Sequence, residues 1–113
     1  MYTVNDLFSN ASPTSRKAYD RLINSLETLG PVIVEPKKTS IHLVNKTGFA
    51  GVHPRKNYFY LEIKSDREIS HPRIDKSEKV SANRYHLRVK MESGDQVDEE
   101  LLGWLKTAYE LSR

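Results

Sequence analysis

The sequence predicts an α+β fold, a two-layer sandwich in which N- and C-terminal helices pack on one face of a mostly antiparallel sheet. Short segments between residues 32 and 91 alternate apolar and polar side chains, the pattern of half-buried strands. Segments before and after them repeat apolar residues every three or four positions, which indicates amphipathic helices. The connections within 31–64 are too short for crossovers, so neighbouring strands there must be antiparallel. Packing both helices on one face of about five strands buries every apolar stripe.

The chain has 113 residues, a size that predicts one domain over 1–113. Hydrophobic residues make up only 37% of it, so we expect a thin core. The absence of cysteine excludes disulfides, zinc–thiolate sites and cysteine nucleophiles. No apolar run approaches the roughly 18–20 residues of a membrane span, and the first residues lack a signal-peptide pattern. We therefore expect a cytoplasmic protein with no membrane partner.

Capping residues predict two helical segments at the start of the chain. The spacing of Thr3 and Asp6 is that of a capping box and predicts a helical turn over 4–9. A second helix begins at Ser12-Pro13, because serine caps free N–H groups and proline loses no hydrogen bond there. Gly30-Pro31 ends this helix. Its apolar stripe comprises Tyr19, Leu22, Ile23, Leu26 and Leu29.

Alternation and turn residues predict five strands followed by a last helix. The strands are expected at 32–36, 39–46, 49–53, 58–64 and 84–91. Their inward side chains are Ile41, Leu43, Phe59, Leu61, Ile63, Tyr85, Leu87, Val89 and Met91. Residues 65–82 show no periodicity and are predicted to form a loop. A helix is expected over 96–111, capped by Asp95 or Ser93, with a buried stripe of Val97, Leu101, Trp104, Leu105, Ala108 and Leu111.

Positive charge is concentrated on the predicted sheet. Residues 31–91 carry thirteen Lys and Arg but only six Asp and Glu, whereas 92–113 carry two and six. The sheet segment therefore has a net charge of +7, which indicates an anionic partner. The alternative is that Lys and Arg only keep an exposed sheet face in solution.

The outward side chains of the strands combine aromatic and basic groups. Tyr58 and Tyr60 share a face with Arg84, His86 and Arg88. This combination is typical of surfaces that stack bases and hold phosphates, although no RNA-binding sequence signature is present. The same surface also fits a homodimer interface, where tyrosine and arginine are common.

Two basic turns are predicted at one end of the sheet. They are Lys37-Lys38-Thr39-Ser40 and Pro54-Arg55-Lys56, and their amines, guanidinium and hydroxyls suit a phosphate or carboxylate group. The candidate ligand-binding residues are thus Lys37, Lys38, Ser40, His42, His53, Arg55, Lys56, Tyr58, Tyr60, Arg84, His86 and Arg88. The alternative interpretation is a pair of solubilising turns.

Sequence motifs for catalysis, metals and cofactors are missing. There is no Gly-x-Ser-x-Gly, no phosphate-binding glycine loop and no HExxH. The histidines at 42, 53, 71 and 86 are far apart in sequence, although His42 and His86 become neighbours if their strands share a face. We expect no catalytic residue, metal or cofactor.

Three functional hypotheses follow. The leading one is a non-enzymatic binding module whose basic, tyrosine-bearing face takes an anionic partner such as nucleic acid. The second, from another class, is a small-molecule-binding protein or small enzyme with a pocket near Lys38, His53 and Arg55. The third is an oligomerisation module.

Long stretches spread over nearly the whole chain are similar to a known family. They are Tyr2–Phe8, Leu29–Val44, Phe49–Lys56, Ile63–Asp66, Val80–His86 and Glu100–Glu110. These stretches resemble the bacterial family called domain of unknown function 5655. Many of its members carry Gly-His-Trp-Gly before the last strand, where this chain has Val80-Ser-Ala-Asn83, which indicates a distinct subgroup. The resemblance implies a compact α+β domain and brings no established activity.

Overall fold

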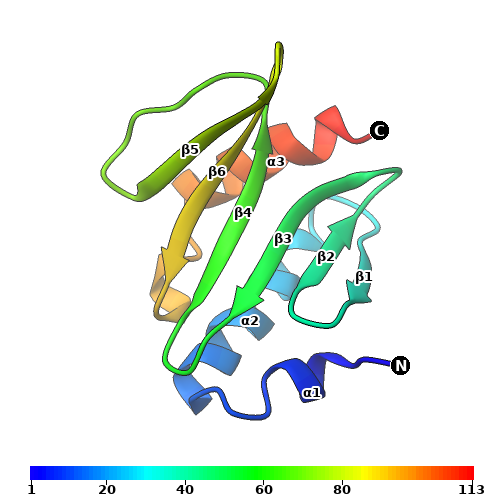
Figure 1. Ribbon diagram of the computed structural model, residues 1–113, viewed down its shortest axis with the longest axis vertical. Coiled ribbons are helices and arrows are strands. Elements are labelled where there is room, and N and C mark those ends of the chain that lie inside the picture. The colour runs from blue at the N-terminus through cyan, green and yellow to red at the C-terminus, as the bar shows by residue number, and fades with distance from the viewer.

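Three α-helices and a six-stranded sheet form two layers in a computed structural model, which describes residues 1–113 (Figure 1). The elements are α1 Val4–Leu7, α2 Pro13–Leu26, β1 Ile33–Pro36, β2 Ile41–Val44, β3 Gly48–Pro54, β4 Phe59–Ser65, β5 Ile74–Ser81, β6 Arg84–Met91, the 3-10 helix η1 Gly94–Gln96 and α3 Glu99–Leu111. The strand order is β1-β2-β3-β4-β6-β5 and every neighbouring pair is antiparallel. The predicted α+β class is confirmed.

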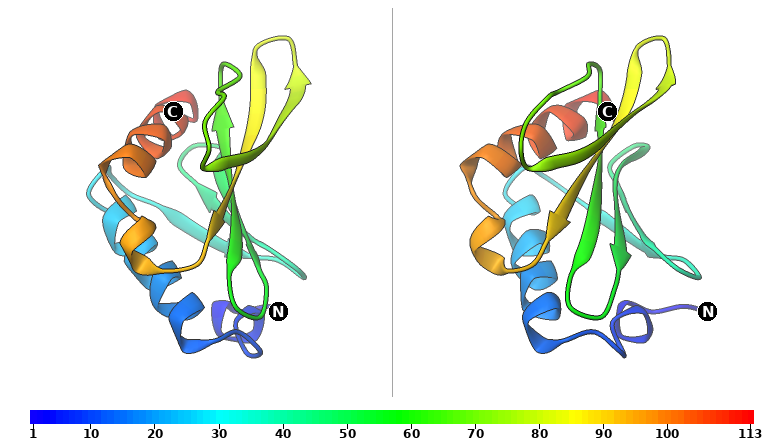
Figure 2. Two further views of the ribbon diagram at one scale, coloured as in Figure 1. Left: turned by 90° about the vertical axis from the view of Figure 1, so that its left-hand side faces the viewer. Right: turned by 60° about the vertical axis from the view of Figure 1, so that its left-hand side comes forward.

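The two long helices lie on the same side of the sheet, as predicted, and leave its other face uncovered (Figure 2). Leu22 and Leu26 of α2 and Leu101 and Leu105 of α3 are fully buried in one core with the inward strand residues. Among the side chains predicted to face the core, five are only half-buried, namely Ile23, Leu29, Tyr85, Trp104 and Leu111. None of the helices combines the length and apolar character that crossing a membrane requires.

Side-chain caps define where the helices begin. The Thr3–Asp6 capping box is present, with both reciprocal hydrogen bonds at 3.1 Å. Ser12 accepts from the Ser15 N–H at 3.2 Å and opens α2. The last helix starts later than predicted, because Asp98 rather than Asp95 or Ser93 caps it, accepting from the Leu101 N–H at 3.0 Å. The turn before it is the short helix η1.

The predicted loop over 65–82 was wrong in its second half, where residues 74–81 form the edge strand β5. Its residues are mostly exposed and include Asp75, Lys76, Glu78 and Lys79, so no apolar alternation reveals it. Charged side chains are a common way to protect an edge strand from pairing with other chains. What defines β5 is its antiparallel backbone pairing with β6, in which Ser77, for example, lies opposite Leu87.

The phenol of Tyr19 on α2 lies in the core, where only 4% of the residue is exposed. Its ring packs on Phe8 with centroids 4.9 Å apart. Burial raises the pKa of Tyr19 from 10.0 to about 12, against an opposing effect of Arg16, because the phenolate is poorly solvated there.

We therefore expect a Tyr19-dependent loss of stability at high pH. Above pH 10 the unfolded chain releases the Tyr19 proton while the folded chain keeps it, so the free energy of unfolding falls as pH rises from 10 towards 12. Tyr19→Phe removes this contribution. Urea unfolding at about pH 8 and pH 11 measures the free energy of unfolding at each pH. Between the two values it should fall less in Tyr19→Phe than in the wild-type protein. Equal losses in the two proteins would contradict the assignment.

Candidate functional site

The uncovered face of the sheet carries one continuous row of residues across all six strands. Successive antiparallel pairings align Glu35, His42, Gly51, Glu62, Arg88 and Lys76. On β2, β3, β4 and β6 the neighbours of these residues point into the core, because side chains of a strand alternate between its faces. The row therefore brings residues from distant parts of the chain onto one surface.

A hollow lies in the middle of this face, above Gly51. It is an open depression with a volume of about 200 Å³, and the side chains of His42, His53, Glu62, Lys64 and His86 line it. A Cβ at Gly51 would stand 3.6 Å from Nε2 of His53, so the ring occupies the space beside the bare backbone. We call these five side chains and Gly51 the Gly51 hollow.

Glu62 joins two histidines of the Gly51 hollow that lie on different strands. Its Oε1 is 2.9 Å from Nδ1 of His86, and its Oε2 is 3.8 Å from Nε2 of His53. The carboxylate thus lies between the two rings and links β3, β4 and β6 on this face. No group of three or more histidines and carboxylates in the protein has the arrangement of a metal site.

Two side chains of the Gly51 hollow have perturbed acid–base properties. Burial lowers the pKa of His53, and Arg55 and His42 lower it further, while Glu62 opposes the change. Burial, with a contribution from Arg84, lowers the pKa of Lys64. Groups with shifted pKa values gathered in a depression mark a candidate functional site.

Tyr58 and Tyr60 form the aromatic part of the face, as predicted. Their rings meet edge to face with centroids 5.3 Å apart. Lys90 lies 4.4 Å above the Tyr58 ring and Arg88 lies 4.3 Å above the Tyr60 ring. Arg55 also lies over the Tyr60 ring, 5.7 Å from its centroid. Because these cation–π contacts surround the rings, an incoming base meets the cations as well as the aromatic rings.

The cations of the face differ in how they are neutralised. Arg88 binds both carboxylate oxygens of Asp75, at 2.8 and 3.4 Å, and so contributes less free positive charge than the sequence suggests. Four other cations form no ion pair with an acidic residue, namely Arg55, Lys64, Arg84 and Lys90. They follow β4 and β6 from the β3–β4 turn to the far end of the sheet.

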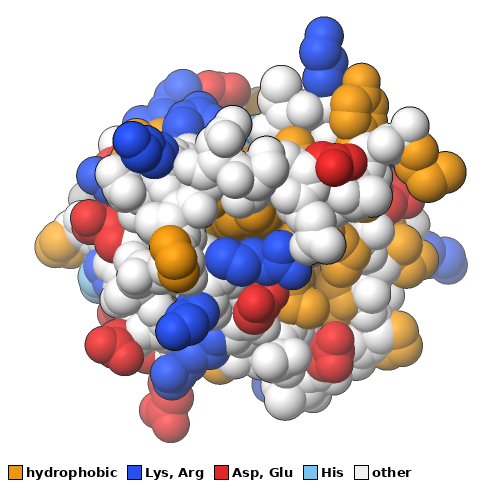
Figure 3. Space-filling model, turned by 90° about the horizontal axis from the view of Figure 1, so that it is seen from below, with side chains coloured by type: hydrophobic (Ala, Val, Ile, Leu, Met, Phe, Trp, Pro, Cys, Tyr) orange, Lys and Arg blue, Asp and Glu red, His pale blue; other side chains and the backbone are white.

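The two predicted basic turns lie at the same end of the sheet, as the antiparallel order requires. Lys37 is paired with Glu35 at 3.7 Å, and Ser40 is buried with 8% exposure. Lys38 and Lys56 are exposed. Seen from the end that carries the β3–β4 turn, most Lys and Arg side chains gather on one half of the surface and most exposed apolar side chains on the other (Figure 3).

The structure thus brings together only part of the predicted site. His42, His53 and His86 meet in one hollow, although they are far apart in sequence. Lys38 and Arg55 do not line that hollow, and Arg84 lies at the opposite end of the sheet from the turns. The candidate ligand-binding residues did not include Glu62 and Lys64, although their positions two and four residues after Tyr60 place them on the same face.

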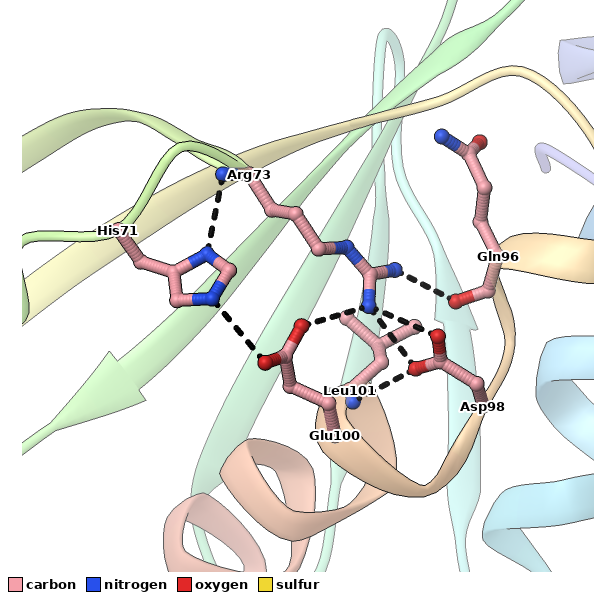
Figure 4. A network of polar contacts seen from close by, with 6 residues as sticks. All are labelled: His71, Arg73, Gln96, Asp98, Glu100 and Leu101. Atoms are coloured by element: carbon pink, nitrogen blue, oxygen red, sulfur yellow. Dashed lines mark hydrogen bonds and ion pairs between the residues drawn. The ribbon is translucent and has the colours of Figure 1, made fainter.

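A second polar cluster is separate from the sheet face and contains the fourth histidine. Arg73 contacts Asp98 at 2.9 Å, Glu100 at 3.1 Å and the Gln96 carbonyl at 2.7 Å, all near the start of α3 (Figure 4). Nε2 of His71 lies 3.0 Å from the same Glu100. We call this set the Arg73 clamp, and its contacts hold the segment before β5 against α3.

Comparisons with known proteins bear on the family of the chain. Searches among curated proteins and among solved structures each found no match. A family model described as domain of unknown function DUF5655 matches residues 4–112, which is nearly the whole chain. The chain therefore belongs to the DUF5655 family.

Proposed function

We propose that the domain is a binding module whose uncovered sheet face takes single-stranded nucleic acid. The observation that carries this proposal is the line of cations without an acidic partner along β4 and β6, namely Arg55, Lys90, Lys64 and Arg84. From residue 84 to residue 90 the strand extends about 20 Å, enough for a short run of phosphates. A cytoplasmic location, which the sequence predicts, would give the domain access to such a partner.

The cation–tyrosine pairs support the same partner. Arg88 presents its guanidinium above Tyr60, and arginine planes and tyrosine rings both stack on unpaired bases. A duplex offers only base edges and phosphates to a flat sheet, whereas a single strand offers base faces as well. The combination of stacking groups and free cations therefore favours a single strand.

Binding is expected to depend on salt and on the free cations of the face. Fluorescence anisotropy with labelled 12-nucleotide DNA and RNA strands, each at two salt concentrations, measures the affinity. Arg84→Glu and Lys90→Glu should each weaken binding about tenfold and reduce its salt dependence, because each removes a phosphate contact.

Lys106→Glu is the matched control, since Lys106 is exposed on α3 in the other layer. It changes the net charge by the same amount and should leave the affinity within about twofold. Salt-independent binding, or equal losses in Lys106→Glu and Lys90→Glu, would exclude the sheet face as the binding surface.

A further inference from the structure

The Gly51 hollow differs from the rest of the sheet face in its density of nitrogen donors. His42 comes from β2, His53 from β3, Lys64 from β4 and His86 from β6. Four strands thus contribute one donor group each to a space of about 200 Å³. A liquid water occupies about 30 Å³, so the hollow has room for a small polyatomic ion.

We propose that the Gly51 hollow is a seat for a terminal phosphate group, the monoester at one end of a bound strand. This inference rests on the nucleic-acid binding proposed above. A terminal phosphate carries three free oxygens and up to two negative charges, whereas a phosphodiester within the strand carries two free oxygens and one charge. Four donors around one hollow match the terminal group better.

Gly51 makes the seat accessible at backbone level. Its missing side chain opens the floor between His42, its cross-strand partner, and Glu62, its partner on the other side. A side chain on this residue would point outward, with its Cβ 3.6 Å from the His53 ring. The glycine thus keeps the middle of the hollow free.

Glu62 is the one carboxylate that lines the hollow, and its charge opposes an anion. Both of its oxygens already face histidine nitrogens, so Glu62 positions the two rings. The charged groups around these histidines are Glu62, Lys64, Arg55 and Arg84, with Glu35 opposite His42 on β1 and Glu78 opposite His86 on β5. A dianion entering this set favours protonation of the imidazoles.

Binding at this seat is therefore coupled to proton uptake. Each imidazole that gains a proton on binding raises the affinity up to tenfold for each unit by which the pH falls. Sulfate is the clean probe of this coupling, because it remains a dianion across the working range. Phosphate monoesters lose their second charge near pH 6, so their affinity passes through a maximum.

The experiment compares three otherwise identical oligonucleotides, with a phosphate at the 5′ end, at the 3′ end or at neither end. At about pH 6.5 one phosphorylated strand should bind about tenfold more tightly than the unphosphorylated strand. The advantage should shrink at about pH 8. In His86→Gln the advantage should be lost while the unphosphorylated strand still binds, whereas His71→Gln, a histidine outside the hollow, should retain it.

The outcomes separate this inference from the proposed function. Equal affinities for all three strands, with salt-dependent binding intact, would overturn the phosphate seat and leave nucleic-acid binding standing. If no strand binds, NMR titration of the histidine rings with sulfate decides. Saturable shifts of His42, His53 and His86 that strengthen as pH falls support the seat, and unchanged rings overturn it.

Discussion

Replacing Gly30 by alanine is expected to lower the free energy of unfolding by about 3 kcal/mol. Gly30 has φ of +143°, a conformation that residues with a side chain rarely adopt. A Cβ there would also stand only 2.5 Å from the Tyr109 hydroxyl oxygen. That hydroxyl donates to the Pro31 carbonyl at 2.7 Å and anchors the end of α3 to the segment before β1.

Urea unfolding of Gly30→Ala measures this loss. A second variant isolates the part that comes from the hydrogen bond, and a third serves as a control. Tyr109→Phe removes the hydrogen bond alone and should cost about 1 kcal/mol. Gly103→Ala is the matched control, because Gly103 is exposed on α3 and a Cβ there meets no atom within 4 Å. This control should stabilise the protein by up to about 1 kcal/mol. If Gly30→Ala and Gly103→Ala changed the free energy of unfolding in the same direction, the loss could not be attributed to the backbone conformation of Gly30.

Replacing Arg73 by alanine is expected to cost about 2 kcal/mol, more than an exposed ion pair contributes. The Arg73 side chain is only 21% exposed and touches Asp98, Glu100 and the Gln96 carbonyl together. Burial acts to lower the pKa of Arg73, but the hydrogen bonds and charges of Asp98 and Glu100 together raise it. Arg73 in turn lowers the pKa of Asp98. Because Asp98 also caps α3, the Arg73 clamp supports the start of that helix.

A double-mutant cycle tests whether this support is mutual. Arg73→Ala, Asp98→Ala and the double variant should show a coupling of about 1 kcal/mol in unfolding free energy. Arg67→Ala is the control, since that side chain is 71% exposed and pairs only with its neighbour Asp66. It should change stability by less than about 0.5 kcal/mol. Additive losses at Arg73 and Asp98 would show that the clamp and the cap act independently.

The fold was predictable from the sequence wherever an element buries one side. Phe59, Leu61 and Ile63 alternate cleanly, and β4 lies at the centre of the sheet with these residues buried. β5 was not predictable, because an edge strand with Ile74 as its half-buried apolar residue gives no periodic signal. Its strand character comes from backbone pairing with β6, and a sequence pattern does not record that pairing.

The start of α3 shows a similar limit. Asp95 and Ser93 are as suitable for capping as Asp98 in chemical type. Asp98 also contacts Arg73, which lies 25 residues earlier in the chain. The cap that forms, Asp98, is thus the one that also makes a tertiary contact, with Arg73. Helix-capping propensities of single residues do not reveal such a contact.

The candidate site was predictable in its residue types and not in its grouping. Outward alternation correctly places Tyr58 and Tyr60 on the face with Arg88. The meeting of His42, His53 and His86 depends on the registers that align β2 with β3 and β4 with β6. A shift of one residue in any of these pairings would turn a histidine into the core.

The alternation along the strands has a consequence for how this domain can diversify. The groups that form the Gly51 hollow project away from the core, while the residues between them, such as Val52, Leu61 and Leu87, are buried. Surface substitutions away from the core usually change stability by less than about 0.5 kcal/mol. Changes to the hollow should therefore alter ligand preference at little cost in folding, so that relatives or engineered variants can exchange one ligand for another on an unchanged scaffold.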